Sequence, residues 1–330
     1  MLLRYESLKN KPKAFRTFTG LDEKEFQMLL RTFTVSYDRY TERRSSIESR
    51  QRDHGGGRKA RLSTYEDKLL FILVYFKTYP LQESLAYHFG MSQGQACQWI
   101  HTLSEILRCA LGELGQLPER EPQKVKKRLQ RYMNEPQQNS QHEAEYHEIE
   151  WETATELGSF GIDGTERRRQ RPKDHDKQKR FYSGKKKTHT VKNNLIVTIR
   201  KRKVEYLGYT WEGKKHDKKI CDEEGHEFPE GSTLYQDTGY QGYEPVGVNI
   251  CQPRKKPRGR ELTVEEKEQN SLISSVRIIV EHVICGIKRC RIVKDVLRNT
   301  KDRFADLVME IACGLHNFRT AYRTGEILNA

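Results

Sequence analysis

The spacing of apolar residues changes twice along this chain, and these changes limit the folds that it can adopt. Up to about residue 131, and again from residue 263 to residue 323, apolar side chains recur at helical intervals. Between residues 157 and 251 they alternate, or form short runs interrupted by glycine, as in strands. The pattern predicts an all-α region followed by an α/β region with closing helices.

Three helices with short turns are predicted in the first region, and they cover residues 63–78, 82–89 and 93 to about 107. Two helices joined by a turn that contains glycine are typical of the helix-turn-helix motif, whose second helix enters a DNA major groove. Gln95 and Gln98 are then candidates for base contact. Many helical bundles share this spacing, so the pattern alone leaves a DNA reader and a plain bundle equally open.

Positive charge dominates the composition, with 60 Lys and Arg against 46 Asp and Glu, a net charge of +14 over 330 residues. This charge favours a polyanionic partner, nucleic acid first and an anionic membrane second. The longest apolar run, residues 69–76, is far shorter than the roughly 20 residues that span a bilayer. Seven cysteines without a Cys-x-x-Cys pair indicate neither a disulfide framework nor a zinc site. We expect a cytoplasmic, nucleoid-associated protein that binds no membrane.

Two aspartates stand at the ends of predicted strands. Asp163 follows a short buried strand and precedes an expected turn at Gly164, and Asp237 ends the strand 233–237. Asp-Gly is also a common turn pair, so Asp163 alone does not indicate chemistry.

A long helix, predicted from residue 263 to about residue 288, carries a third carboxylate, Glu281. Arg277 precedes it by four residues and Lys288 follows it by seven. At about 100° per residue, all three fall within about 40° of one another on the helix. An ordinary ion pair along the helix would give the same pattern. Together with the two aspartates, however, Glu281 completes a set of hard oxygen ligands suited to two Mg²⁺ or Mn²⁺ ions and to phosphoryl transfer.

Basic residues gather in two stretches of this region. Arg254, Lys255, Lys256 and Arg258 follow a predicted strand, and they form either a solvated loop or a phosphate clamp. The segment from residue 167 to residue 187 holds eleven Lys and Arg around a proline and is expected to be a basic loop.

Several motifs together resemble bacterial insertion-sequence transposases with an Asp-Asp-Glu triad, in the group that has an N-terminal helix-turn-helix. In chain order they are Gly55–Arg58, Ile162–Glu166, Tyr182–Lys187, Gly213 with His216-Asp217, Leu234–Tyr243, and Arg277-x3-Glu281-x6-Lys288. The resemblance extends from about Phe18 to Arg323. One departure is Ser274, which stands where the family usually has a Tyr, three residues before the Arg.

The resemblance implies an RNase H-like catalytic domain: a mixed sheet of five strands, the first three antiparallel, with helices on both faces. It implies that Asp163, Asp237 and Glu281 are catalytic and bind two Mg²⁺ (or Mn²⁺) ions. Contacts to DNA phosphate are expected from the basic residues near these motifs, namely Arg277, Lys288, Arg254, Lys255, Lys256, Arg258, Lys185, Lys186 and Lys187.

The expected domain order is an N-terminal helical region with a basic loop (1–60), a helix-turn-helix domain (61–115), a linker (116–156) and the catalytic domain (157–330). The expected function is that of a transposase that binds the terminal inverted repeats of its element, cleaves DNA strands with metal-activated water, and joins the 3′-OH ends to target double-stranded DNA. It is expected to act as a dimer or larger assembly. A non-catalytic DNA-binding regulator, an inactive transposase relic, and a nuclease without strand transfer are the alternatives.

Overall fold

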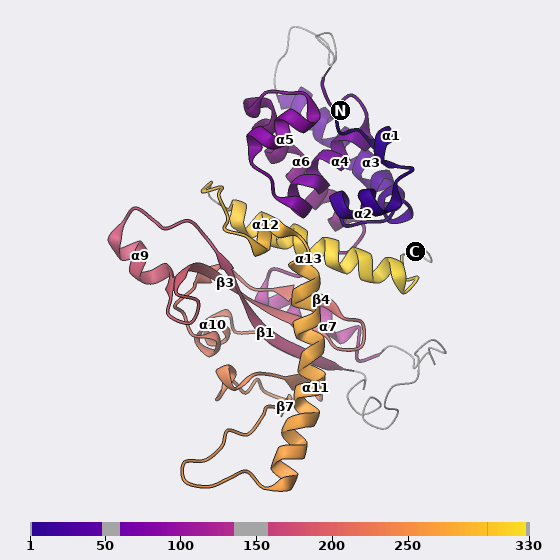
Figure 1. The fold of residues 1–330 in the computed structure, drawn as a ribbon. Coiled ribbons are helices and arrows are strands. Elements are labelled where there is room, and N and C mark those ends of the chain that lie inside the picture. The colour runs from indigo at the N-terminus through magenta and orange to yellow at the C-terminus, as the bar shows by residue number, and fades with distance from the viewer. Residues whose placement is uncertain (1, 48–59, 135–157, 302, 328–330) are drawn as a thin grey trace. The chain divides into compact units, whose positions relative to one another are not determined.

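The structure is a computed structural model that describes residues 2–47, 60–134, 158–301 and 303–327 (Figure 1). The chain divides into two compact units. The helical unit comprises Met1–Leu117 and Ile287–Ala330, and the sheet unit comprises Pro118–Gly286. The closing segment was expected to belong to the catalytic domain, whereas in the structure residues from 287 onward group with the N-terminal helices. The motif Gly55–Arg58 lies outside the described residues.

The helical unit contains α1 (Tyr5–Leu8), α2 (Pro12–Thr19), α3 (Glu23–Ile47), α4 (Tyr65–Thr78), α5 (Gln82–Phe89), α6 (Gln93–Glu113), α12 (Arg291–Lys294) and α13 (Phe304–Arg323). The three predicted helices of the helix-turn-helix are confirmed as α4, α5 and α6. The side chain of Ser92 accepts a hydrogen bond from the Gln95 N–H, and Gln95 Oε1 accepts one from the Ser92 N–H. This reciprocal cap fixes the start of α6 after the turn at Gly90, whose φ is +69°.

The long apolar run of the sequence forms the centre of the helical unit. Every residue of α4 from Asp67 to Phe76 is buried, so this helix is surrounded by its neighbours rather than packed on one side. The closing segment is bound to this unit, because the Asn317 side chain of α13 donates to the Gln116 carbonyl and Arg298, between α12 and α13, donates to the carbonyls of Tyr79 and Pro80. These contacts explain why the end of the chain joins its beginning.

The sheet unit contains, in chain order, η1 (Pro122–Lys124), α7 (Val125–Gln130), β1 (Ser159–Arg168), α9 (His175–Phe181), β2 (Tyr182–Ser183), β3 (Thr188–Thr198), β4 (Lys203–Leu207), β5 (Trp211–Glu212), α10 (Asp217–Glu224), β6 (Thr233–Tyr235), η2 (Thr238–Tyr240), β7 (Asn249–Cys251) and α11 (Val264–Ile287). The predicted basic loop between residues 167 and 187 is wrong in part, since β1 extends into it and α9 and β2 lie within it. Asp174 caps α9 by accepting from the Lys177 N–H at 2.8 Å.

The sheet is mixed, as expected. β1 pairs antiparallel with β3, and β3 pairs antiparallel with β4, whereas β6 and β7 continue parallel to β1 on its other side. The first three long strands are therefore antiparallel and the last two parallel, which confirms the predicted RNase H-like sheet. The short strands β2 and β5 pair with other stretches of β3.

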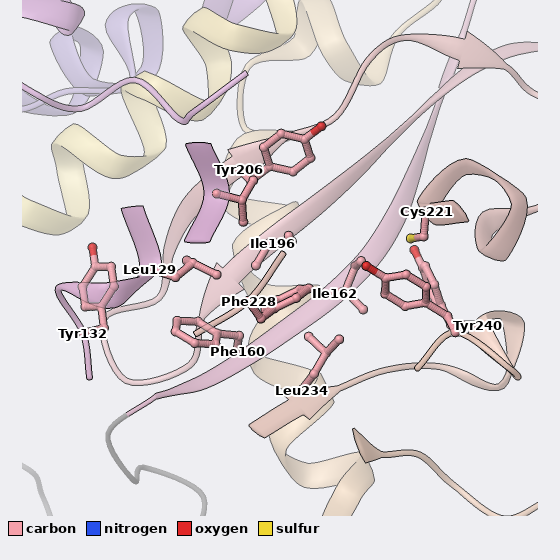
Figure 2. Packing of buried hydrophobic residues seen from close by; sticks show 12 residues of the cluster. Leu129, Tyr132, Phe160, Ile162, Ile196, Tyr206, Cys221, Phe228, Leu234 and Tyr240 are labelled. Carbon is pink, nitrogen blue, oxygen red and sulfur yellow. The ribbon is translucent and has the colours of Figure 1, made fainter. Parts of the chain in front are cut away.

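Helices cover both faces of the sheet. On one face Phe160 and Ile162 of β1 pack in a buried cluster with α7, α10 and the residues that follow β6 (Figure 2). On the other face lies α11, because a side chain at Gly161 would meet Val280 at 2.3 Å. Figure 1 shows α11 crossing the sheet along much of its length. Alternate residues of β1 thus face different layers, and Asp163 shares the α11 face with Gly161.

The segment that begins the predicted linker is part of the sheet unit. Residues 118–134 include α7, and Glu119 exchanges backbone hydrogen bonds with Glu205 and Leu207 of β4. The fully buried carboxylate of Glu205 pairs with Arg128, at 2.8 Å, and with Arg131. Burial opposes its charge, but the two guanidinium groups outweigh burial and hold the pKa of Glu205 below its usual range. The rest of the predicted linker lies outside the described residues.

The predicted turn at Gly164 is wrong, because β1 continues through it to Arg168. Gly164 pairs with Asn194 of β3. A Cβ at this position would lie 2.7 Å from Asp217 Oδ1 and 3.2 Å from Asn194 Oδ1. Glycine is needed here for the close approach of neighbouring side chains and not for a reversal of the chain.

Candidate active site

Two carboxylates occupy matching positions on neighbouring parallel strands. The last paired residues of β1 and β6 are Gly161 and Tyr235, and Asp163 and Asp237 each follow two residues later. In parallel strands equal offsets keep residues side by side, and an offset of two returns each to the same face of the sheet. The fold therefore brings the two predicted catalytic aspartates together, Asp163 in the middle of β1 and Asp237 just after β6, on the face that α11 covers.

Arg277 of α11 reaches this pair. Its Nη2 lies 3.6 Å from Asp237 Oδ2, and the Asp237 side chain remains 43% exposed. Glu281 follows Arg277 by one turn on the same helix and is exposed. The structure thus brings together Asp163, Asp237 and Arg277, while Glu281 lies further along the same side of α11.

The electrostatics of Asp163 are unusual for a carboxylate. Burial is the main cause that raises its pKa to about 6, and the negative charges of Asp237 and Asp217 raise it further. The Gly164 N–H, which donates to Asp163 Oδ1 at 2.7 Å, and the charge of Arg277 act in the opposite direction. Burial, with the two neighbouring carboxylates, therefore outweighs the hydrogen bond and the charge of Arg277.

A further acidic residue, Asp217, lies beside the pair and was given no role from the sequence. It is the first residue of α10, and its Oδ1 lies 3.0 Å from Lys192 Nζ of β3 and against Gly164. The signal in the sequence was the His216-Asp217 pair among the family motifs. Nothing in its local pattern indicated that α10 would place this carboxylate next to β1.

The donor set of the site suits a hard divalent cation, since carboxylate oxygens are the preferred ligands of Mg²⁺ and Mn²⁺. Within the described ranges of the chain, however, no group of three or more His, Cys, Asp or Glu lies close enough to hold a metal ion. Lys192 and Arg277 contact Asp217 and Asp237 instead. The chemistry of the residues fits a divalent cation, while their present arrangement is that of a site balanced by protein cations.

Two of the four residues of the predicted phosphate clamp bind carboxylates of the protein. Arg254 Nη1 bonds to Glu266 at 3.2 Å, and Lys256 bonds to Glu261. Lys255 and Arg258 are exposed on the same loop. The other predicted phosphate contacts lie elsewhere: Lys185, Lys186 and Lys187 are exposed in the turn between β2 and β3, and Lys288 follows α11 in the helical unit.

Both predicted base-contacting residues are exposed on α6. Gln95 also caps its helix, as described above, so its amide oxygen already accepts a hydrogen bond from the Ser92 N–H. Gln95 and Gln98 border a hollow of about 330 Å³ whose other walls come from α3, α6 and the residues before α4, including Tyr37, Tyr40, Arg44, Arg61 and Trp99. Aromatic and guanidinium groups beside amides are a suitable lining for a nucleic-acid contact.

Two family models match this chain. Residues 60–113 match the helix-turn-helix of DDE superfamily endonucleases, and residues 162–317 match the DDE superfamily endonuclease itself. The chain belongs to the DDE superfamily. The first match covers α4 to α6, and the second begins one residue before Asp163 and includes Asp237, Arg277 and Glu281.

A curated relative extends this similarity. The chain is 28% identical over 267 residues to the probable transposase for insertion sequence element IS702 from Microchaete diplosiphon, covering 81% of this chain and 84% of that protein. No solved structure matches. Membership of the superfamily supports nuclease-type enzyme activity and, with the helix-turn-helix, DNA binding.

One helix of the described residues, α11, has the length and mean hydropathy that a membrane span requires. Core helices of soluble proteins pass the same test. In this DDE superfamily member the helix packs Val280 against the sheet and carries Arg277 to Asp237. These contacts account for its apolar face without a membrane.

Proposed function

We propose that this DDE superfamily member is a DNA transposase that binds the terminal inverted repeats of its element, cleaves DNA strands there, and joins the freed 3′-OH ends to target DNA. The observation that carries the proposal is that Asp163 on β1 and Asp237 just after β6 lie side by side, beneath the helix that bears Arg277 and Glu281. The match to the probable transposase over most of both chains supports the same function.

Within this proposal Asp163, Asp237 and Glu281 would hold two Mg²⁺ or Mn²⁺ ions, and Asp217 is a further carboxylate beside Asp163. Ions bound there supply Lewis-acid activation of the attacking and leaving oxygens of a phosphodiester. Arg277, released from Asp237, contacts phosphate or offsets the charge of the aspartates when no ion is bound. Lys192 holds Asp217 in place through the ion pair at 3.0 Å.

The DNA contacts of the proposal divide between the two units. In the helical unit α6 reads the terminal repeat through Gln95 and Gln98, and in the sheet unit Lys255, Arg258 and the lysines after β2 hold phosphates. Joining two ends requires at least two active sites, so the protein acts on DNA as a dimer or larger assembly. Its place is the cytoplasm, in association with the nucleoid.

Single substitutions of the three acidic residues test the proposal. Asp163→Asn, Asp237→Asn and Glu281→Gln are each expected to bind duplexes made from the DNA that flanks the reading frame, yet to fail to nick them with Mg²⁺. Asp176→Asn, which alters an exposed carboxylate on α9, should retain both activities. Cleavage by the Asp163→Asn protein would remove this residue from the mechanism.

One observation favours the second candidate, a DNA-binding protein that has lost catalysis. In the described chain the carboxylates do not form a three-ligand metal group, and Arg277 pairs with Asp237. Thermal unfolding with increasing Mn²⁺ separates the two candidates. Stabilisation of the wild-type protein that disappears in Glu281→Gln supports the enzyme, and its absence in the wild type supports the relic.

A further inference from the structure

A polar hollow lies directly beside Asp237 in the sheet unit. It has a volume of about 410 Å³ and opens between the residues that follow β6 and those that follow β7. Thr238, Gln241, Gln252, Lys255 and Arg260 are among its walls. This volume falls within the range of roughly 300–1,000 Å³ that is usual for small-molecule sites, so the hollow has room for a nucleotide-sized group.

One wall of the hollow is rigid before any ligand arrives. The Arg254 N–H donates to Asn270 Oδ1 at 2.8 Å, and Asn270 Nδ2 donates to the Arg254 carbonyl at 3.0 Å. Glu266, which caps α11 together with Thr263, also accepts from Arg254 and Arg260 at 3.2 and 3.0 Å. The loop after β7 is thereby fixed to the start of α11, and a preformed wall loses little entropy on binding.

The hollow is also connected to the candidate active site by direct hydrogen bonds. Gln252 Nε2 donates to the backbone carbonyl of Asp237 at 2.6 Å, and Thr238 Oγ1 donates to Asp237 Oδ1 at 3.1 Å. A group bound in the hollow would therefore lie next to the bond on which Asp237 acts.

The lining suits a nucleotide, with groups for its base and groups for its phosphate. Both guanidinium groups of the wall are bound to the single carboxylate of Glu266, so with Lys255 the hollow keeps a net positive charge that suits a backbone phosphate. The remaining polar groups are chiefly the amides of Gln241 and Gln252 and the hydroxyl of Thr238, with Pro253 and Pro257 as apolar surface. Side-chain amides match the paired donors and acceptors of base edges. Lys255, on the rim, suits the phosphate attached to such a base.

We propose that this hollow binds the base of the nucleotide that flanks the phosphodiester to be cleaved, and that Gln241 distinguishes that base. The inference rests on the proposed function, because it assumes a DNA strand at Asp237. Gln252 is held by the Asp237 carbonyl and supplies a fixed acceptor, whereas Gln241 is exposed at the end of η2 and supplies the selective contact. A base can enter the hollow only by leaving the stack of the duplex.

Fluorescence tests the inference without requiring cleavage. The full-length protein is mixed with duplexes of the flanking DNA that carry 2-aminopurine at successive positions around the element end. We expect fluorescence to rise several-fold at one position only, because the analogue brightens when it leaves the stack. Gln241→Ala should abolish most of this rise, while Gln269→Ala, which alters an exposed glutamine on α11, should leave it unchanged.

Cleavage rates on duplexes with each of the four bases at that position give the second measurement. The wild-type protein is expected to favour one base by roughly 5- to 100-fold, as a good base contact gives, and Gln241→Ala should reduce the preference to about twofold or less. Equal rates on all four bases, or a preference that survives in Gln241→Ala, overturns the inference and leaves the proposed function standing. If no duplex is cut, the proposed function fails, and the fluorescence measurement still decides whether the hollow takes a base.

Discussion

The charge on Asp163 lowers the stability of the metal-free protein, and its removal should therefore stabilise the fold. In the native state this carboxyl keeps its proton up to about pH 6, whereas its ordinary pKa is 3.8. Between these pH values the native state binds more protons than the unfolded state, so the free energy of unfolding falls as the pH rises. Above pH 6 the full cost applies, which at about 1.4 kcal/mol for each pKa unit amounts to about 3 kcal/mol.

Asp163→Asn removes this cost while its amide oxygen can still accept from the Gly164 N–H. The variant should match the wild type near pH 4 and gain about 3 kcal/mol at pH 8, or about 6–12 °C in the melting temperature of a unit of this size. The measurement is chemical and thermal unfolding of both proteins in chelator, from pH 4 to pH 8. Asp176→Asn, at an exposed position, serves as the control and should change stability little at any pH.

The difference between Asp163→Asn and the wild type must depend on pH for this reasoning to hold. An equal effect at pH 4 and pH 8, or a decrease in stability at pH 8, would show that the carboxylate is not under electrostatic strain. Saturating Mn²⁺ should reverse the order of stability at pH 8, because a bound cation stabilises only a protein that keeps its ligand.

Three further predictions concern packing and DNA. Gly164→Ala should lower the free energy of unfolding by about 1–3 kcal/mol, since its Cβ would meet two side-chain oxygens. The control Gly184→Ala, whose Cβ would have no atom within 4 Å, should leave this free energy unchanged. Urea unfolding of both variants measures the difference. Glu205→Gln should cost roughly 3 kcal/mol in the same assay, because it leaves two guanidinium groups without a buried counter-charge. Neutralising Lys255 and Arg258 should weaken binding to all DNA sequences alike. The slope of log K against log salt should also fall by about one for each phosphate that the protein no longer neutralises. Weaker binding to one sequence alone would contradict this prediction.

The secondary structure could be predicted where the caps and the apolar spacing of a short segment agree with its packing in the folded protein. The helices around the Gly90 turn were predictable because Ser92 and Gln95 form their cap within four consecutive residues. The strand that carries Asp163 was predictable because the apolar residues Phe160 and Ile162 alternate with glycine and aspartate. Local signals were sufficient at these places, since tertiary packing agrees with them.

Local signals were insufficient where distant residues decide the outcome. The Asp163-Gly164 pair is a turn signal. In the structure, however, β1 pairs with β3 through both residues, and Asp217 occupies the space that a side chain at Gly164 would need. The grouping of the final helices also depends on distant contacts, because Asn317 and Arg298 bind partners in the helical unit. No window of sequence contains these contacts, so periodicity could identify the elements but not their neighbours.

Burial and the balance of charge at the candidate site together explain the raised pKa of Asp163. Asp217 has Lys192 and Asp237 has Arg277, each within ion-pair distance. Asp163 is acted on by the charges of both these carboxylates, and among the described residues its hydrogen bond comes from its own neighbour, the Gly164 N–H. A half-buried negative charge left in this way costs stability, and proteins keep such costs chiefly at functional sites. The raised pKa of Asp163 is the expression of that cost in the metal-free state, and a bound divalent cation would remove it. The same arrangement that destabilises the free protein therefore favours the ion that the proposed chemistry requires.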